Sequence, residues 1–376
     1  MKDLLELRKD IDRIDHEIVR LYEERMGISK QVAEYKIANG KPVFDKQREV
    51  EKLEDLSSLG SSEFNSKGIR ELFDQIMTIS RKKQYQLLTE SGLKEDVGFV
   101  QKDMPDFSSA RIVFQGVEGA YSQQAMKEFF GADCNGHPVA TWKDAMEAIK
   151  NQEADFAVLP IENSSAGIVS ENYDLLVEYD NYIVGDQIIK IDHSLLGLDE
   201  ASLEDISCVY SHPQALMQCS DFLEEHSNWE KLSFSNTAMA AKKVKDEGLK
   251  NQAAIAGSIT ADIYGLKVLE KAIQNNKNNC TRFIIVTGKK VYTKEASRIS
   301  ICFEIPHESG SLYHMLSHFI YNNLNMTNIQ SRPIQNRNWE YRFFIDFEGR
   351  FEDTAVQNAL RGLREETTSL RILGTY

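Results

Sequence analysis

Apolar residues near the N-terminus recur at alternating spacings of three and four positions. The repeating residues are Leu4, Leu7, Ile11, Ile14, Ile18, Leu21, Ile28, Val32 and Tyr35. This heptad pattern predicts one long helix that packs lengthwise against partner helices. The position between Leu21 and Ile28 that should continue the pattern holds Arg25. A guanidinium on a buried stripe keeps its proton and needs an anionic partner, either a carboxylate of the protein or a ligand. Alternatively, Arg25 only fixes the register of the packed helices.

The hydrophobic pattern divides residues 1–88 into three predicted helices. The heptad helix ends at Asn39-Gly40, a sequence typical of a helix C-terminus. A second helix spans about 45–59 and a third about 66–88, with a Gly-Ser-Ser loop between them. We therefore expect an all-α domain at 1–88.

Three further zones follow along the chain. Residues 89–108 lack periodicity and predict a linker. Residues 109–290 alternate short apolar strands with helical stretches, which predicts an α/β domain with a largely parallel sheet. Residues 297–376 follow the order strand, helix, strand, strand, helix, strand. Their alternating strands predict an α+β domain with a half-buried antiparallel sheet and helices on one face, so the whole chain is expected to be multidomain.

Composition narrows the classes of function. The chain has 376 residues, of which 41% are hydrophobic and 27% charged, as in soluble globular proteins. A net charge of −14 disfavours nucleic acid as a partner. The sequence shows neither a signal peptide nor an apolar run long enough to cross a membrane. The five cysteines form no CxxC pair, so we expect no disulfides, no metal site and a cytoplasmic location.

Charged and amide side chains recur at helical spacing on all three predicted helices. Arg25 and Lys36 are 11 positions apart, close to three turns, so they share one face about 16 Å apart. Further polar residues share faces of the second and third helices, namely Asp45, Arg48, Glu49, Ser80 and Gln84. Such a set could enclose a small dianion. Arg8 lies 17 positions before Arg25, about 25 Å and about 100° away, so it could join only from a second chain.

The segments that carry these residues resemble the all-helical chorismate mutase family, whose members are intertwined dimers. The resembling runs are LLELRKDIDRIDHEI, EERMGISKQVAEYK, KPVFDKQREVEKL and RELFDQIMTIS. The resemblance implies that Lys36 and Gln84 are catalytic donors to the ether oxygen. It also implies that the remaining substrate contacts are Arg8 (from a second subunit), Arg25, Asp45, Arg48, Glu49 and Ser80. Conversion of chorismate to prephenate needs no nucleophile or proton transfer, so fixed cations and amide donors suffice.

In the central segment, several predicted strands end in glycine or small polar residues. These junctions are Gly116–Gly119, Glu162–Gly167, Ser211–Gln214, Asn236-Thr237 and Thr281-Arg282-Phe283. Polar residues at the carboxyl ends of parallel strands indicate a shared ligand cleft. Taken singly, each Ser, Thr or Asn could instead be a helix N-cap. The glycine spacing is not GxGxxG, so a dinucleotide site is disfavoured. The family resemblance described next implies that no organic cofactor is needed.

The same segment resembles the prephenate dehydratase family, with a fold of two α/β lobes around the active site. The resembling motifs are GVEGAYSQQA, LPIENSSAGIV, KIDHSLLG, YSHPQALMQC, NTAMAA and NCTRFIIV. The resemblance implies that Thr281 is the catalytic donor. It places the other substrate contacts at Glu162, Asn163, Ser211, Gln218, Thr237, Arg282 and Phe283. His212 is the alternative acid, because a threonine hydroxyl is a very weak one. Asn236 departs from the usual serine of the family.

The C-terminal segment resembles the ACT regulatory domain, which in this family binds phenylalanine between subunits. Two motifs carry the expected effector contacts, Gly310, Ser311 and Leu312 in one and Gln330, Ser331, Arg332 and Pro333 in the other. Both depart from the usual forms, because Tyr313 is bulkier than the usual valine and Gln330 replaces glutamate. The alternative is a purely structural dimerisation domain.

These observations lead to one hypothesis and two alternatives. The chain is expected to be a bifunctional enzyme of phenylalanine biosynthesis that acts on chorismate and prephenate. It is expected to work as a homodimer or higher oligomer with L-phenylalanine as effector. One alternative is a dehydratase whose mutase-like segment serves only dimerisation. The other is a non-enzymatic small-anion binding protein.

Overall fold

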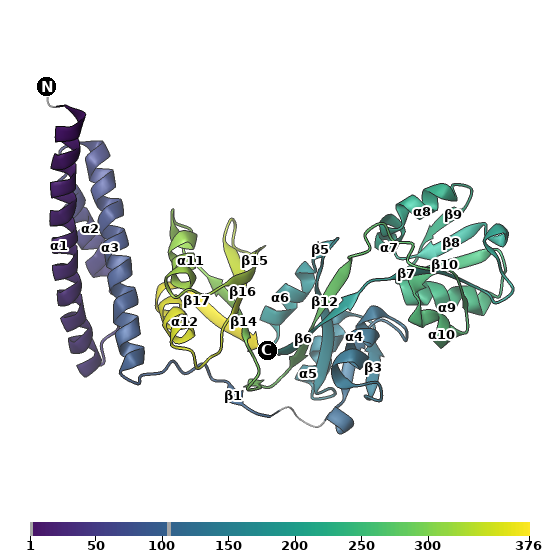
Figure 1. The fold of residues 1–376 in the computed structure, drawn as a ribbon. Coiled ribbons are helices and arrows are strands. Elements are labelled where there is room, and N and C mark those ends of the chain that lie inside the picture. The colour runs from purple at the N-terminus through teal and green to yellow at the C-terminus, as the bar shows by residue number, and fades with distance from the viewer. Residues whose placement is uncertain (1–2, 104–106) are drawn as a thin grey trace. The chain divides into compact units, whose positions relative to one another are not determined.

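The computed structural model describes residues 3–103 and 107–376 and divides the chain into two compact units (Figure 1). The first unit contains residues 1–97 and 297–372, and the second contains 98–296 and 373–376. The predicted helical and C-terminal segments therefore share one unit. None of the helices within the described residues combines the length and apolar character needed to cross a membrane.

The N-terminal segment consists of α1 (Leu4–Ala38), α2 (Lys46–Ser58) and α3 (Glu63–Glu90). The first two helices confirm the predicted bounds, and the third begins three residues earlier than expected. Each begins at a side chain that accepts a hydrogen bond from the first helical turn, namely Asp3, Asp45 and Ser62.

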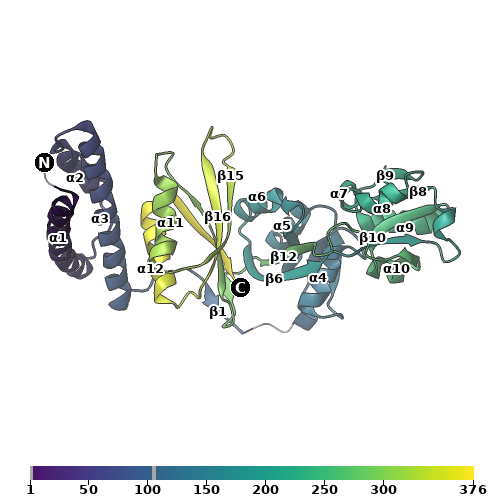
Figure 2. The same cartoon turned by 45° about the horizontal axis from the view of Figure 1, so that its top comes forward.

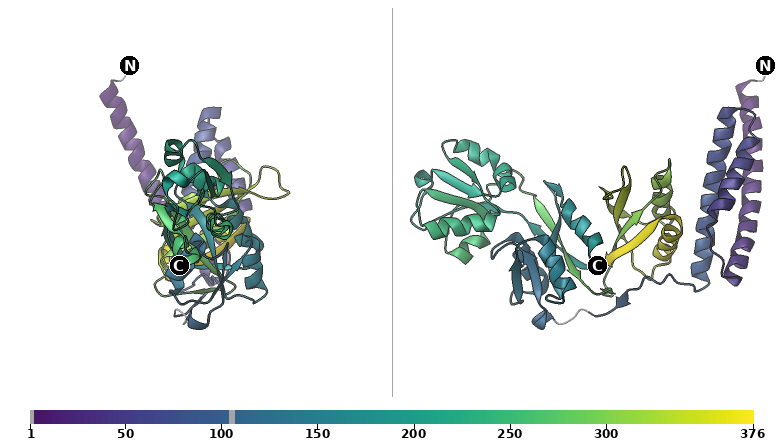
Figure 3. Two further views of the ribbon diagram at one scale, coloured as in Figure 1. Left: turned by 90° about the vertical axis from the view of Figure 1, so that its right-hand side faces the viewer. Right: turned by 180° about the vertical axis from the view of Figure 1, so that it is seen from behind.

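The heptad residues of α1 are exposed in the single chain. Ile11 is 56% and Ile18 is 50% exposed, whereas the buried residues of this helix are Ser29 and Ala33. Figure 3 (left) shows α1 diverging from α2 and α3 toward its N-terminal end. The apolar stripe that predicted partner helices is therefore largely uncovered within one chain.

The C-terminal segment has the predicted order of elements. They are β14 (Arg298–Glu304), α11 (Ser311–Tyr321), β15 (Met326–Pro333), β16 (Tyr341–Glu348), α12 (Thr354–Glu366) and β17 (Ser369–Thr375). The strands are ordered β15-β16-β14-β17, with β16 antiparallel to both β14 and β15. Both helices lie on one side of these strands, toward α3 (Figure 2). Helix α12 packs directly against α3.

The second unit has two lobes, and the first lobe is built on a mixed sheet. Its strands are ordered β6 (Tyr182–Lys190), β12 (Cys280–Thr287), β4 (Phe156–Asn163), β2 (Ile112–Gln115) and β3 (Gly136–Val139), with β5 (Gly167–Ile168) beside β4. Helices α4 (Tyr121–Phe130), α5 (Trp142–Lys150) and α6 (Ser170–Glu178) belong to this lobe. Strand β12 runs antiparallel to both β4 and β6, which corrects the prediction of a largely parallel sheet. After the second lobe, the chain returns to this sheet as β12. This strand lies between β4 and β6 and runs in the direction opposite to both.

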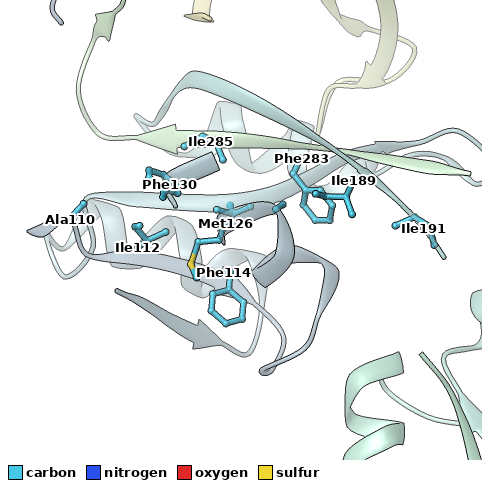
Figure 4. Packing of buried hydrophobic residues seen from close by; sticks show 11 residues of the cluster. Ala110, Ile112, Phe114, Met126, Phe130, Ile189, Ile191, Phe283 and Ile285 are labelled. Atoms are coloured by element: carbon cyan, nitrogen blue, oxygen red, sulfur yellow. The ribbon is translucent and has the colours of Figure 1, made fainter. Parts of the chain in front are cut away.

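The core of the first lobe lies between this sheet and α4. Phe114 and Met126 are 0% and 1% exposed, and Phe283 and Ile285 extend into the same cluster from β12 (Figure 4). Residues 281, 283 and 285 point to one side because side chains alternate along a strand. The orientation of Thr281 is therefore fixed by the burial of Phe283.

The second lobe has a mixed sheet ordered β11 (Lys267–Glu270), β7 (His193–Gly197), β10 (Gln252–Gly257), β8 (Cys208–Ser211) and β9 (Glu230–Ser233). Its helices are α7 (Pro213–Gln218), α8 (Ser220–Glu225), α9 (Thr237–Glu247) and α10 (Ile259–Tyr264). The predicted linker 89–108 contains one short strand, β1 (Val100–Gln101), which pairs in parallel with β13 (Val291–Tyr292).

Candidate active sites

A cavity of about 550 Å³ lies between the two lobes of the second unit. The N-termini of α4, α6, α7 and α9 open onto it, represented by Tyr121, Ser170, His212 and Thr237. Helix N-termini carry partial positive charge and free N–H groups that attract anions. The cavity is therefore suited to an anionic ligand, although its described lining residues include Glu171 and neither lysine nor arginine.

Thr281 and Asn163 form the polar pair at the base of this cavity, where β12 begins and β4 ends. The Asn163 amide donates to Thr281 Oγ1 over 2.9 Å, and its oxygen accepts from the backbone N–H groups of Ser165 and Ala166. Because Asn163 Oδ1 accepts these two hydrogen bonds, the NH2 group is the end of the amide that faces Thr281. Because Thr281 Oγ1 accepts from Asn163, the Thr281 hydroxyl proton remains available for a ligand.

His193 is buried on the second-lobe side of the cavity. Its Nε2 lies 3.0 Å from Gln218 Oε1, and its Nδ1 lies 3.2 Å from the Tyr121 hydroxyl. Burial lowers the pKa of His193, which favours the neutral imidazole. His193 thus orients Gln218 at the cavity wall.

Two further groups on the cavity wall are possible donors or acids. His212 is partly exposed there, its Nδ1 accepts from the Gln214 backbone N–H over 3.2 Å, and burial lowers its pKa. Trp142 lines the cavity with an indole Nε1–H that is buried without a hydrogen-bond partner among the described residues. An unpaired buried donor is costly, so a ligand acceptor would stabilise Trp142.

In the first unit, a second polar cluster lies between α1 and α3. Ser80 Oγ donates to Ser29 Oγ over 2.9 Å, and Gln84 Nε2 donates to Ser80 Oγ over 3.3 Å. Among the described residues, Arg25 Nη1 and Gln84 Oε1 are buried without a hydrogen-bond partner. Burial lowers the pKa of Arg25, although nearby Glu49 opposes this. A buried cation donor and a buried acceptor therefore lack partners that a ligand could provide.

Lys36 and Glu49 flank this cluster. Lys36 Nζ donates to the Val43 carbonyl over 2.6 Å, and burial lowers the Lys36 pKa against the opposing effect of Asp45. Glu49 forms an ion pair with Arg81, and burial nevertheless raises the pKa of Glu49. Asp45 itself caps α2 by accepting from the Arg48 backbone N–H over 3.1 Å.

Known protein families match both regions. A family model described as "Chorismate mutase type II" matches residues 7–85, and one described as "Prephenate dehydratase" matches residues 112–291. A bifunctional chorismate mutase/prephenate dehydratase of Buchnera aphidicola subsp. Schizaphis graminum (strain Sg) is 34% identical over 381 residues, covering 100% of this chain and 96% of the relative. The chain belongs to the bifunctional chorismate mutase/prephenate dehydratase family. It rearranges chorismate to prephenate and converts prephenate to phenylpyruvate for phenylalanine biosynthesis.

Solved structures resemble the greater part of this chain. A prephenate dehydratase from Arthrobacter aurescens in complex with L-Phe has a TM-score of 0.66 and 29% identity, covering 71% of this chain and 89% of that chain. A protein described as GqqA, a novel type of quorum quenching acylases, has the same TM-score and identity, covering 71% of this chain and 97% of that one.

Three residues of the predicted dehydratase set do not line the cavity, and their contact with substrate stays a prediction. Arg282 points to the opposite face of β12 from Thr281, where its guanidinium lies 3.8 Å from Glu162 and 3.3 Å from the Tyr376 hydroxyl. Strand alternation explains both, because Glu162 precedes Asn163 just as Arg282 follows Thr281. Ser211 is fully buried and donates to the Ile255 carbonyl over 2.6 Å.

The remaining predicted dehydratase residues, Asn163, Gln218, Thr237, Thr281 and Phe283, line the cavity. Asn236, the departure from the family pattern, caps α9 through a 2.7 Å hydrogen bond from the Met239 backbone N–H. Sequence reasoning gave no role to His193, Tyr121 or Trp142. His193 lies inside the motif KIDHSLLG and Tyr121 inside GVEGAYSQQA, whereas the sequence around Trp142 gave no signal.

The predicted mutase and effector residues are only partly brought together in one chain. Arg8 and Arg48 are exposed. In the C-terminal segment, Gly310, Ser311 and Leu312 line a cavity of about 300 Å³. The lining of this cavity includes none of the other four predicted effector residues, which lie on β15. Within the described part of one chain, therefore, neither the predicted mutase residues nor the predicted effector residues all lie together.

Proposed function

We propose that the two reactions occur at two separate sites, with Thr281 as the donor of the dehydratase. The observation that supports this most directly is the Asn163–Thr281 hydrogen bond, because it leaves the Thr281 proton free to point into the cavity. In the reaction, the bond between the ring and its carboxylate breaks, carbon dioxide leaves, and the electron pair of that bond completes the aromatic ring. The ring C–O bond breaks at the same time, and the departing hydroxyl takes a proton to become water. Donation from Thr281 stabilises the negative charge on that oxygen.

We assign substrate binding in the dehydratase to helix N-termini and neutral donors. The N-termini of α4, α6 and α9 would hold the carboxylates of prephenate, and Gln218 and Trp142 would donate to its oxygens. His212 remains the alternative acid, since it lines the same cavity. Its lowered pKa makes the imidazolium scarce at neutral pH, which favours Thr281.

For the mutase we propose that Arg25, Lys36 and Gln84 surround the substrate, with Arg48 and Asp45 at the edge and Ser80 beneath. The unpaired Arg25 Nη1 and Gln84 Oε1 support this assignment, because each can be satisfied by an oxygen or hydroxyl of chorismate. Burial raises the pKa of Glu49 against the opposing effect of Arg81, so a hydrogen bond from the Glu49 carboxyl to an anionic substrate would form more readily as the pH falls.

We also propose that a second copy of the chain completes the mutase site. The heptad stripe of α1 is exposed along its length, and Arg8 is exposed near the N-terminal end of the same helix. A second α1 packed along this stripe would bury the apolar residues and bring its own Arg8 to the site. Dimerisation and catalysis would then use the same helix.

For regulation we propose that the C-terminal segment is an ACT domain that binds L-phenylalanine. The relative from Arthrobacter aurescens was solved with L-Phe, and here Gly310 and Ser311 line a cavity at the start of α11. Gly310 has φ 86°, a conformation that favours glycine. The β15 motif does not line this cavity, so we propose that the two motifs of one effector site come from two subunits. We place the enzyme in the cytoplasm.

The function is tested with the purified chain and chorismate. Appearance of phenylpyruvate, read by its ultraviolet absorbance in alkali, is the expected result. Formation of phenylpyruvate from prephenate but not from chorismate would show that the mutase segment serves only dimerisation. Absence of product from both substrates would refute the proposal and favour a binding protein. Arg25→Ala should remove the first reaction alone and Thr281→Ala the second alone.

A further inference from the structure

The last turn of α12 places two consecutive carboxylates, Glu365 and Glu366, against the mutase helices. The Glu366 side chain is 4% exposed and pairs with Arg81 of α3 through two hydrogen bonds, Nε to Oε1 over 2.9 Å and Nη2 to Oε2 over 3.2 Å. Such a bidentate pair fixes both the position and the plane of the guanidinium. The orientation of Arg81 is therefore set by a residue of the C-terminal segment.

The other edge of the Arg81 guanidinium contacts Glu49, one of the predicted substrate-binding residues of the mutase. Arg81 Nη1 donates to the Glu49 carboxylate, Nη2 also donates to Thr78 Oγ1 over 3.1 Å, and the Phe44 ring lies 4.9 Å from the guanidinium carbon. Arg81 is 5% exposed, so water cannot replace these contacts freely. One buried cation thus connects Glu49 on α2 to Glu366 on α12.

Glu365 makes the matching contact to the loop between α1 and α2. Its Oε2 accepts from the Phe44 backbone N–H over 2.8 Å and from the Tyr85 hydroxyl over 3.1 Å. The preceding residue in that loop, Val43, supplies the carbonyl that holds Lys36 Nζ. Glu365 therefore fixes the backbone on which the Lys36 ammonium rests.

Docking of α12 on α3 does not depend on these two carboxylates alone. Thr89 Oγ1 donates to Asn358 Oδ1 over 2.6 Å near the other end of the contact, and Lys82 Nζ donates to Ser317 Oγ over 2.7 Å. Thr89 is eight residues from Arg81, or about 12 Å along α3. The segments are thus held together at points that do not touch Lys36 or Glu49.

We propose that Glu365 and Glu366 are positioning residues of the mutase, which hold Lys36 and Glu49 in place through the Val43-Phe44 loop and Arg81. This inference rests on the proposed roles of Lys36 and Glu49. It makes the geometry of the mutase site dependent on the C-terminal segment. Neither carboxylate touches substrate, so their effect falls on kcat more than on KM, because Arg25 and the other binding cations are left in place.

The test uses the full-length chain with the variants Glu366→Gln and Glu365→Gln. Each is expected to lower mutase kcat by about tenfold, the size of one lost charged hydrogen bond, with dehydratase activity unchanged. Asn358→Ala is the matched control on the same helix, since it removes a docking hydrogen bond and is expected to leave mutase kcat unchanged. Loss of mutase activity in Asn358→Ala equal to that in Glu366→Gln would overturn the proposal.

A double variant separates positioning from a merely structural role. Replacing both partners by apolar residues, Arg81→Met with Glu366→Leu, removes the Arg81 charge that Glu366→Leu alone leaves without this partner, and it also leaves Glu49 without Arg81, so folding stability is measured beside mutase kcat. Mutase kcat should stay low in the double variant, because Glu49 loses its partner. Recovery of mutase kcat together with stability would overturn the proposal. Glu49→Ala is measured alongside: if it leaves mutase activity intact, the proposed role of Glu49 fails, whereas loss in Glu49→Ala with none in Glu366→Gln refutes only the positioning role.

Discussion

Replacing Glu366 by glutamine should change how the stability of the first unit depends on pH. Burial alone would raise the pKa of Glu366. His318 of α11, whose Nε2 lies 3.3 Å from Glu366 Oε1, and Arg81 outweigh burial and lower the pKa from 4.5 to about 2. A carboxyl with a lowered pKa in the folded state stabilises that state above its unfolded pKa. This stabilisation is lost as the pH falls through about 2.

The size of the effect follows from the two pKa values. The difference between 4.5 and about 2 corresponds to about 3 kcal/mol of unfolding free energy at neutral pH. Of this, about 2 kcal/mol should already be lost by about pH 3. The glutamine variant cannot titrate at this position. The difference in unfolding free energy between the unmodified chain and Glu366→Gln should therefore shrink by about 2 kcal/mol between about pH 7 and about pH 3.

Urea unfolding followed by far-ultraviolet circular dichroism measures this difference, because the helical segment lies in the first unit. Amide hydrogen exchange in α12 and α3 reports the same unit locally. Glu348→Gln is the control, since Glu348 is exposed on β16 in the same segment and should show no such change. A difference between Glu366→Gln and the unmodified chain that stays constant across the pH range would refute the reasoning.

Four other predictions concern the two sites. Thr281→Val should lower dehydratase kcat by about 100-fold or more while Thr281→Ser retains most of it, and equal loss in both would argue against a hydroxyl donor. Trp142→Phe should raise the dehydratase KM by about tenfold, since an unpaired donor is removed; an unchanged KM would show that the indole N–H does not meet substrate. Mutase activity should fall as pH rises through the raised pKa of Glu49, and Glu49→Gln should abolish this fall, as a pH–rate profile would reveal. Mixed Arg8→Ala and Arg25→Ala chains should recover mutase activity through one intact site per heterodimer, and no recovery despite proven subunit exchange would contradict the contribution of Arg8 from a partner.

Local sequence signals were enough to predict where several helices begin and end and in which order the C-terminal elements follow. Asn39-Gly40 ended the first helix at the position observed, and Asp45 began the second as its N-cap. The strand–helix order of residues 297–376 was also readable, because alternation of period two and helical periodicity differ within a few residues. These features depend on neighbours in sequence.

Features that depend on distant residues were not readable in the same way. The sequence shows that β12 is a buried strand, but its direction depends on entry between β4 and β6 after the chain has built the second lobe. That direction decides that Thr281 meets Asn163 while Arg282 turns away. The family motif placed Arg282 in the substrate set, and only the strand geometry shows which face it occupies.

Arg25 and the stripe in which it lies require two different partners from outside the single chain. The heptad residues are apolar and exposed, so they call for another apolar surface. Arg25 Nη1 is buried without a partner among the described residues, so it calls for an oxygen acceptor, and chorismate is a dianion that carries several. A second α1 would cover the apolar heptad residues. It would still leave Arg25 Nη1 without an acceptor, because its apolar face brings no anion to Arg25. Register fixing and substrate binding are therefore separate requirements of one helix, and only the second explains why the residue at position 25 is a cation.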